Sequence, residues 1–476
     1  MLIGRKEEQR ELTRALEWDE SAFIAVTGRR RVGKTYLVRE TFNNTFTFQH
    51  TGLANQKTRS QLGAFRRSLM DCGLRKCRVL TDWFDAFHTL ADWLRTMPAE
   101  GDKKILFIDE ISWLDAPRSN FVSALGYFWN TFVSARKDMV LIICGSATSW
   151  IVNKVFRDRG GLHNRVTHRI NLMPFTLHEC ELYSDTHRLG FTRTDILECY
   201  MVLGGVPFYW SLLERGLSVS QNIDRLLFDR NGKLHNEYND LFDSLFKHPD
   251  PYIAVVSALG KKRVGMTREE IISEGDHITG NGTLTRVLED LEACGFIRTY
   301  RYRGIKHRTT IHQLIDNYTL FYYKFLHNRP AVDEGYWSAN INTPTRNSWE
   351  GLAFERVCFL HYKQIKQALG ISGVLTSIYS WRVDDDPEGG RGAQIDMVID
   401  RADRVVNLCE MKFSTREFAV TKDIDLAMRN KMGRFVESVG RNKAMHLTLI
   451  TPHGVKNNMY QFAFDRVITA DDLFKE

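Results

Sequence analysis

The first part of the chain alternates short apolar runs with longer stretches of helical periodicity. Four runs rich in β-branched and aromatic residues stand out, at 22–26, 45–48, 105–108 and 140–143. Apolar strands separated by helices are typical of a parallel sheet that is covered on both faces. The pattern therefore predicts an α/β fold for residues 1–174, built on a parallel central sheet.

A different rhythm of polar and apolar positions follows. Residues 175–248 indicate helices, interrupted at the sequence GGVP of residues 204–207. Residues 249–330 contain three helical patterns and then a hairpin that begins after Gly295. Apolar residues spaced three and four apart mark the third of these helices. Three helices followed by a hairpin predict a winged helix.

A linker and a second α/β domain complete the predicted organisation. Residues 331–348 follow Pro330 and contain Pro344 together with asparagines and threonines, a composition typical of linkers. Residues 349–476 open with a long helical pattern, continue into strands and end in mixed elements. We therefore expect an α/β core, a helical segment, a winged helix, a linker and a C-terminal α/β domain.

Composition changes this picture only slightly. The chain has 476 residues, of which 43% are hydrophobic and 26% are charged, as in ordinary globular proteins. Its apolar runs are far shorter than the roughly 20 residues of a membrane span, so we expect a cytoplasmic protein without membrane contact. The eight cysteines form no C-x-x-C pair, which argues against zinc and disulfides. The net charge of +7 mildly favours an anionic partner.

Residues 28–35 carry the strongest chemical signal. Their sequence, GRRRVGKT, matches the P-loop pattern G-x-x-x-x-G-K-[ST] between a predicted strand and a predicted helix. Backbone amides of such a loop surround phosphates, and the helix N-terminus adds positive potential. Lys34 would contact the β- and γ-phosphates of ATP, and the Thr35 hydroxyl would bind Mg²⁺. The other loop residues expected to bind ATP are Gly28, Arg29, Arg30, Arg31, Val32 and Gly33.

Polar residues after the next strands complete the predicted ATP site. Asp109 and Glu110 directly follow the apolar run 105–108. Asp109 would hold Mg²⁺ through water, and Glu110 would polarise the water that attacks the γ-phosphate. Ser146, after the following strand, is placed to contact the γ-phosphate or that water. These residues predict binding and hydrolysis of ATP.

Several motifs together resemble a known family. Residues 4–12 (GRKEEQREL), the P-loop, and the segments 172–175 and 204–207 are similar to motifs of prokaryotic AAA+/STAND-type ATPases of the archaeal type. The resemblance implies a P-loop core, a helical lid over 175–248, a winged helix and a restriction-endonuclease-like domain at the C-terminus. It also suggests Arg165 as the arginine that senses the γ-phosphate. Homo-oligomerisation is left open.

The predicted winged helix has two interpretations. Its third helix carries Glu289, Asp290 and Glu292 on the expected exposed face, and these would weaken binding to DNA phosphates. The hairpin could contact DNA instead through Arg298, Arg301, Arg303, Lys306 and Arg308. The alternative, which the sequence favours, is an intramolecular role in which the winged helix packs on the ATPase core and transmits the nucleotide state.

Charged residues also alternate on a predicted hairpin near the C-terminus. Asp396, Glu410 and Lys412 have the spacing D-x(13)-E-x-K, which resembles a PD-(D/E)XK nuclease core. Asp396 and Glu410 on adjacent strands could bind Mg²⁺ or Mn²⁺. Lys412 could orient a metal-bound water and help to deprotonate it for attack on a phosphodiester. Glu355, on the preceding helix, is a further candidate metal ligand.

Two functions of different classes follow from these motifs. In the first, ATP binding and hydrolysis control a metal-dependent nuclease that acts on DNA or RNA. In the second, the protein is an ATP-driven signalling switch whose C-terminal domain recruits a partner without cleavage. A separate, purely structural alternative is an endonuclease-like fold retained for packing. The complete set of Asp396, Glu410 and Lys412 favours the first function.

Overall fold

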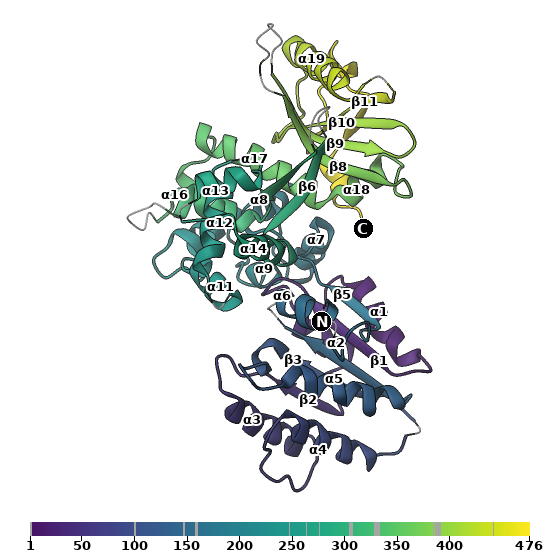
Figure 1. Cartoon of the computed structure of the whole chain (residues 1–476). Coiled ribbons are helices and arrows are strands. Elements are labelled where there is room, and N and C mark those ends of the chain that lie inside the picture. The colour runs from purple at the N-terminus through teal and green to yellow at the C-terminus, as the bar shows by residue number, and fades with distance from the viewer. Residues whose placement is uncertain are drawn as a thin grey trace. The chain divides into compact units, whose positions relative to one another are not determined.

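The protein divides into two compact units, described by a computed structural model (Figure 1). One unit is Met1–Pro174 with Ala293–Gly295, and the other is Phe175–Glu292 with Phe296–Glu476. The division after Pro174 falls where the sequence places the end of the α/β core. The structure describes residues 2–99, 101–145, 148–157, 160–246, 248–262, 264–275, 277–303, 308–327, 334–383, 385, 392–440 and 442–476. Among them, no helix has the length and apolarity needed to cross a membrane.

A five-stranded sheet forms the centre of the first unit, with the order β2-β3-β4-β1-β5. Every neighbouring pair is parallel. The strands are β1 (Ala22–Thr27), β2 (Phe48–Thr51), β3 (Lys104–Asp109), β4 (Met139–Cys144) and β5 (His168–Asn171). This confirms the predicted α/β fold. Because the strands are parallel, the carboxyl ends of β1, β3 and β4 meet at one edge of the sheet.

Helices cover both faces of this sheet. They are α1 (Lys6–Glu17), α2 (Lys34–Thr41), α3 (Thr58–Asp71), α4 (Trp83–Arg95), α5 (Phe121–Thr131) and α6 (Thr148–Ile151), with the helical turns η1 (Ile111–Leu114), η2 (Val133–Ala135) and η3 (Val152–Phe156). Successive residues of β1 point to opposite faces. Phe23 and Ala25 belong to one core cluster, whereas Ile24 and Val26 belong to the other. The unbroken apolar sequence of the strand follows from this burial on both sides.

The second strand lies later in the chain than its composition suggests. The sequence indicates a strand at 45–48, but β2 begins at Phe48. The ring of Phe46 packs against that of Phe107, with centroids 5.2 Å apart, so this β-prone residue is used for packing before the strand starts. In β2, an edge strand, Gln49 and Thr51 are exposed, which explains why polar residues occupy it.

The second unit begins with helices, as expected for residues 175–248. They are α7 (Leu177–Thr186), α8 (Arg193–Leu203), α9 (Pro207–Trp210), α10 (Val219–Ile223), η4 (Asp224–Phe228) and α11 (Glu237–Leu245). The segments 172–175 and 204–207 meet here, because the amide of Phe175 donates to the carbonyl of Gly205 at 2.6 Å. The hydroxyl of Tyr200 donates to the carbonyl of Phe175 at 2.9 Å. Backbone contacts thus join the two motifs.

Three helices and a hairpin come next, in the order on which the winged-helix hypothesis rests. They are α12 (Asp250–Gly260), α13 (Arg268–Glu274), α14 (Gly282–Ala293), β6 (Ile297–Arg303) and β7 (Arg308–Leu314). One residue of the expected acidic face is placed differently. Asp290 is buried and accepts a hydrogen bond of 2.7 Å from the hydroxyl of Tyr252, while Glu289 and Glu292 are exposed. Packing of α12 on α14 brings the tyrosine to this side of the helix.

The segment expected to be a linker contains helices where the structure describes it. They are α16 (Tyr336–Ala339) and the start of α17 (Pro344–Leu360), and the segment is preceded by α15 (Asn317–Phe321) and η5 (Tyr322–Leu326). Pro344 occupies the first turn of α17, a position that suits proline because the first helical amides have no partner in the helix. Arg346 forms ion pairs with Glu350 at 2.8 Å and Glu198 at 3.5 Å. Side chains therefore tie this segment to α8.

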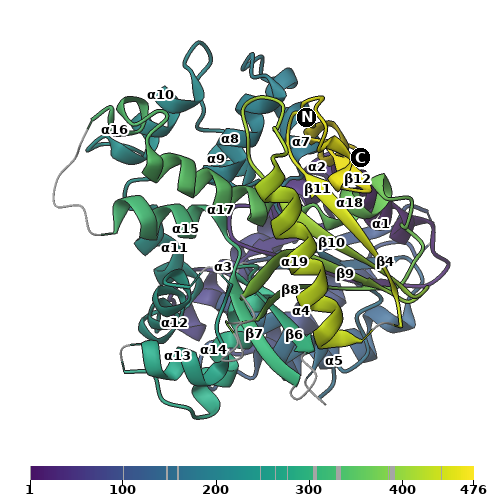
Figure 2. The same ribbon diagram turned by 90° about the horizontal axis from the view of Figure 1, so that it is seen from above.

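A second five-stranded sheet forms the C-terminal part of this unit, in the order β12-β11-β10-β9-β8. Its strands are β8 (Thr376–Val383), β9 (Ala393–Arg401), β10 (Val405–Met411), β11 (Ala444–Ile450) and β12 (Arg466–Ile468), accompanied by α18 (Tyr362–Ala368), α19 (Lys422–Val439), η6 (Gln461–Ala463) and α20 (Ala470–Leu473). Strands β8, β9 and β10 are antiparallel, and β11 and β12 continue parallel to β10. Helix α19 runs across one face of the sheet (Figure 2), where Phe435 packs on Trp381.

Candidate functional site

The P-loop connects β1 to α2, and its shape depends on glycine. Gly28 has a φ of 137°, and a Cβ there would lie 2.3 Å from the carbonyl oxygen of Leu172. Any side chain at this position would push β1 away from the segment that follows β5. Val32 is buried in the core cluster with Ile24, which anchors the loop to the sheet. Arg29 is buried, whereas Arg30 and Arg31 are half-buried.

Lys34 is held inside the loop. Its Nζ donates hydrogen bonds to the carbonyls of Gly28 and Arg29, both at 2.9 Å. Burial lowers the pKa of the Lys34 ammonium, and neighbouring acidic groups, among them Glu110 and Asp109, oppose this shift. The ammonium thus lies within the ring of loop backbone, where the motif places the β- and γ-phosphates.

Thr35 and Asp109, the predicted Mg²⁺-binding pair, are in direct contact. The Thr35 hydroxyl donates to Asp109 Oδ2 at 2.8 Å, and Asp109 is only 5% exposed. The amide of Glu110 donates to Asp109 Oδ1, also at 2.8 Å. A hydroxyl that donates to a carboxylate still offers lone pairs to a cation. These oxygen donors therefore fit Mg²⁺, a hard cation that prefers oxygen.

Gly52, which follows β2, approaches Glu110 closely. A Cβ at Gly52 would lie 2.5 Å from the carbonyl oxygen of Glu110. The amide of Gly52 also donates to the carbonyl of Asp109 at 3.0 Å. Glu110 itself has a left-handed φ of 48°, which is uncommon for a residue with a side chain. The close approach of Gly52 to Glu110 was not predicted from the sequence. The only sequence feature that points to Gly52 is its position directly after a β-prone run.

One other described residue, Arg165, is not part of this cluster. Arg165 is exposed in a turn that precedes β5. Ser146 lies outside the described residues, so its predicted role stays a prediction. The core of the site that the structure assembles is therefore Lys34, Thr35, Asp109 and Glu110.

In the C-terminal sheet, strand register brings Asp396 and Glu410 together. Cys409 of β10 pairs with Met397 of β9, and one further step along the same register sets Glu410 opposite Asp396. The amide of Met411 donates to Asp396 Oδ2 at 3.1 Å, so this carboxylate takes the place of a backbone acceptor. Both carboxylates are buried, with exposures of 6% and 4%.

Two lysines neutralise Glu410. Lys412 lies 2.8 Å from Glu410 Oε1, and Lys431 of α19 lies 2.6 Å from Oε2. Burial acts to raise the pKa of Glu410, but the two ammonium groups outweigh it and hold that pKa below its ordinary value. Burial and repulsion from Glu410 raise the pKa of Asp396. From the sequence, Lys431 could line a nucleic-acid backbone or lie on a solvated helix face, and nothing in the sequence shows that α19 crosses this sheet.

A β-bulge lies at the same place. The pairing of β8 with β9 shifts by one residue between Tyr379 and Trp381, across from Asp396 and Met397. Bulges occur frequently next to functional sites, where they redirect a side chain. Glu355 is buried on α17. Within the described ranges, no group of three or more His, Cys, Asp or Glu side chains is arranged to hold a metal ion, so Glu355 does not join the carboxylate pair in such a group.

The basic residues of the hairpin do not form one exposed surface. Arg298 donates to Gln313 at 2.6 Å and to Ser380 of β8 at 3.2 Å, and its guanidinium lies 3.4 Å from the ring centroid of Phe359. Burial lowers the pKa of Arg298 to about 9. Arg301 is exposed. Lys306 and the side chains of Arg303 and Arg308 lie outside what the structure describes.

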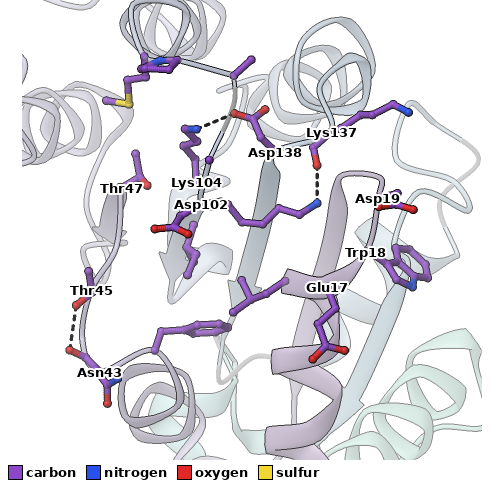
Figure 3. Close-up of a pocket in the computed structure, with 18 of the residues that line it drawn as sticks. Glu17, Trp18, Asp19, Asn43, Thr45, Thr47, Asp102, Lys104, Lys137 and Asp138 are labelled. Carbon is purple, nitrogen blue, oxygen red and sulfur yellow. Dashed lines mark hydrogen bonds and ion pairs between the residues drawn. The ribbon is translucent and has the colours of Figure 1, made fainter.

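A cavity of about 1180 Å³ lies at the other edge of the first sheet, beside the amino ends of β3 and β4 (Figure 3). Its labelled walls include Trp18, Asp102, Lys104 and Asp138. Lys104 and Asp138 are paired within it at 3.2 Å. Since parallel strands place the P-loop at their carboxyl ends, this cavity is separate from the ATP site, and no predicted site residue lines it.

Comparison with known proteins finds a likeness that covers the first unit and the start of the second. Residues 2–213 match a family model described as an ATPase domain predominantly from Archaea. This part of the chain is therefore similar to ATPase domains of that archaeal type.

Individual relatives are more distant. An uncharacterised protein of Methanocaldococcus jannaschii is 23% identical over 363 residues, which cover 75% of this chain and 76% of that protein. Similar solved structures include a Walker-type ATPase of Pyrococcus abyssi, 16% identical, covering 68% of this chain and 96% of that chain with a TM-score of 0.47. The ORC2 protein of Aeropyrum pernix, in its ADPNP–ADP complexes, is 15% identical over 68% of this chain and 93% of that chain, with a TM-score of 0.38.

Proposed function

We propose that the protein binds ATP with Mg²⁺, hydrolyses the ATP, and uses its nucleotide state to control a metal-dependent nuclease site in the C-terminal domain. The observation that carries the ATP half is the contact of Thr35 with Asp109 beside the buried ammonium of Lys34. The archaeal ATPase family match over residues 2–213 supports the same conclusion.

In this proposal, each residue of the ATP site has one task. Lys34 exchanges the carbonyls of Gly28 and Arg29 for the β- and γ-phosphates. Thr35 and Asp109 hold Mg²⁺, which would draw negative charge from the phosphates. Glu110 orients the attacking water and accepts its proton. Arg165, on an exposed turn, and Ser146 are assigned to the γ-phosphate, and the exposure of Arg165 suits a contact between subunits of a homo-oligomer.

The C-terminal site has the charge pattern that a phosphodiester requires. Two neighbouring buried carboxylates repel each other, and Asp396 and Glu410 would hold Mg²⁺ or Mn²⁺, which relieves that repulsion. The cation would supply Lewis-acid polarisation of the phosphodiester. Lys412, whose side chain is 41% exposed, can reach both Glu410 and solvent, and in this proposal it orients the attacking water. DNA and RNA are both candidate substrates.

One observation favours the signalling switch as the second candidate function. Both carboxylate oxygens of Glu410 already have an ammonium partner. The negative charge of Glu410 is therefore balanced without a bound metal ion. In that case the C-terminal domain would recruit a partner according to the nucleotide bound, and no strand would be cut.

Incubation of the full-length protein with labelled DNA and RNA, single- and double-stranded, separates the two candidates. Each substrate is tested with Mg²⁺ and with Mn²⁺, in the presence and absence of ATP. We expect cleavage of at least one polymer by the wild type and none by Asp396→Asn or Lys412→Ala. The matched control is Lys443→Ala, which removes a lysine paired with Asp400 on the same sheet. Absence of cleavage, or equal cleavage by Asp396→Asn, would overturn the nuclease proposal.

A further inference from the structure

Cys144 is the last residue of β4 and contacts the carboxylate of the ATP site. Its Sγ donates to Asp109 Oδ1 at 2.7 Å, and the residue is 0% exposed. Strand β4 lies between β3, which carries Asp109, and β1, which leads into the P-loop. The cysteine therefore lies at the sheet edge where Lys34, Thr35, Asp109 and Glu110 converge.

The hydrogen bonds of Asp109 are divided between its two oxygens. Oδ1 accepts from the Cys144 thiol and from the amide of Glu110. Oδ2 accepts from the Thr35 hydroxyl. A carboxylate with donors on both oxygens cannot turn about χ2 without breaking these bonds. The thiol and the amide together thus hold Oδ2 toward Thr35.

We propose that Cys144 is a positioning residue, whose thiol fixes Asp109 in the orientation that it needs to hold Mg²⁺ together with Thr35. This inference rests on the proposed function of the ATP site. A cysteine suits both demands of the position, since it packs like a small apolar residue and still has a weak donor. The core cluster around it includes Ile142 and Val26, and a more polar side chain would meet that apolar surface.

A role in packing alone makes the opposite prediction for substitutions. Cys144→Ser keeps a donor but fits an apolar core poorly, whereas Cys144→Val fills the space without a donor. Positioning therefore requires Ser to preserve the site better than Val, and packing requires Val to preserve it better than Ser. Cys144→Ala removes both the donor and the volume, and it serves if the Val variant does not fold.

The test measures binding of a non-hydrolysable ATP analogue to the full-length protein by calorimetry, once with Mg²⁺ and once with EDTA. The ratio of the two dissociation constants reports how much Mg²⁺ contributes to binding of the analogue. The dissociation constant in EDTA divided by that in Mg²⁺ should be about 10-fold smaller in the Val and Ala variants than in wild type, the scale typical for groups that orient metal ligands. In the Ser variant this ratio should stay near the wild-type value. Binding in EDTA should be unchanged in all variants.

Each other outcome decides against the inference. A Val variant with the wild-type Mg²⁺ ratio would show that the thiol only fills space. A Ser variant that loses as much as Val would show that a donor at this position does not preserve the site, which also overturns the inference. If the wild type binds the analogue equally with Mg²⁺ and EDTA, the proposed Mg²⁺ site itself falls, and that result is separate because it needs no Cys144 variant.

Discussion

At the scale of single residues, the ATP site is organised around the carboxylate of Asp109. Thr35, the Glu110 amide and Cys144 each donate to it. The spacing of the P-loop and the Asp-Glu pair after an apolar strand predict the first two partners, because these motifs have fixed positions in a parallel sheet. No sequence motif marks Cys144, and its contact with Asp109 can be inferred only from the order of strands β3, β4 and β1.

Lys34→Ala should abolish ATP binding. The variant loses the side-chain cation that the motif places on the β- and γ-phosphates, while the loop backbone remains. Calorimetric titration with ATP measures the effect, with Lys57→Ala, an exposed lysine of the same unit, as control. If Lys34→Ala binds ATP with wild-type affinity, Lys34 does not contribute to the ATP site.

Glu110→Gln should keep ATP binding and lose turnover by about 100-fold or more, the scale of a lost general base. The amide keeps the shape of the side chain but cannot take a proton from the attacking water. Phosphate release under saturating ATP measures turnover, and the same calorimetry checks binding. A Gln variant that turns over at the wild-type rate would mean that another group activates the water.

At the scale of elements, the hairpin β6–β7 is attached to the C-terminal sheet. Tyr300 of β6 belongs to the same core cluster as Trp381 of β8. Arg298 bonds Ser380, which lies in the strand segment opposite the bulge that carries Asp396. This supports an intramolecular role for the hairpin on the C-terminal sheet, and packing of the winged helix on the ATPase core stays a prediction.

Arg298→Ala should destabilise the second unit by about 1–3 kcal/mol, the range for hydrogen bonds to a charged group. Denaturant unfolding followed by tryptophan fluorescence measures this loss. Arg301→Ala, an exposed neighbour on the same strand, should change stability by less than about 0.5 kcal/mol. If Arg298→Ala is as stable as wild type but binds nucleic acid more weakly, the hairpin contacts nucleic acid instead.

His361 should make the second unit sensitive to acid. Its Nε2 accepts from the amide of Leu177 at 2.9 Å and its Nδ1 donates to the carbonyl of Val357, so the ring is neutral. Burial lowers the pKa of His361 to about 4. Because the folded pKa lies below the unfolded value of about 6.5, the stabilisation is complete above that pH and is lost as the pH falls toward 4.

The acid sensitivity is measured by thermal unfolding between pH 7 and pH 4. His361→Gln should be less stable than wild type at pH 7 but should lose less stability on acidification, because glutamine does not titrate. His453→Gln, at an exposed position, should leave the pH profile unchanged. If the stability of His361→Gln falls with pH as steeply as that of wild type, other groups govern acid unfolding.

Prediction of elements from the sequence succeeded where burial on both faces makes a strand uniformly apolar, as in β1 and β4. It placed β2 too early, because an edge strand such as this one tolerates polar residues. The predicted exposure of Asp290 was wrong, and Arg298 is half-buried. Both outcomes have a common reason. Helical or strand periodicity shows which face of an element is polar, but a tyrosine or an adjacent sheet can cover that face, and only the tertiary structure shows this.

At the scale of the whole molecule, the chain combines a part similar to archaeal-type ATPase domains with a C-terminal sheet that holds a carboxylate–lysine site. The sequence predicted Asp396, Glu410 and Lys412 as one site from their spacing across a hairpin. It did not predict the pairing of Lys431 with Glu410, because this contact depends on how α19 crosses the sheet. Control of one site by the other is the central claim of the proposed function.

The most direct test of that claim is the rate of nucleic-acid cleavage by the full-length protein as a function of ATP concentration, compared between wild type and Lys34→Ala. We predict that wild-type cleavage changes with ATP and reaches half of that change at the ATP dissociation constant of the P-loop, whereas cleavage by Lys34→Ala does not respond to ATP. Cleavage that is identical in both proteins at every ATP concentration would contradict the account.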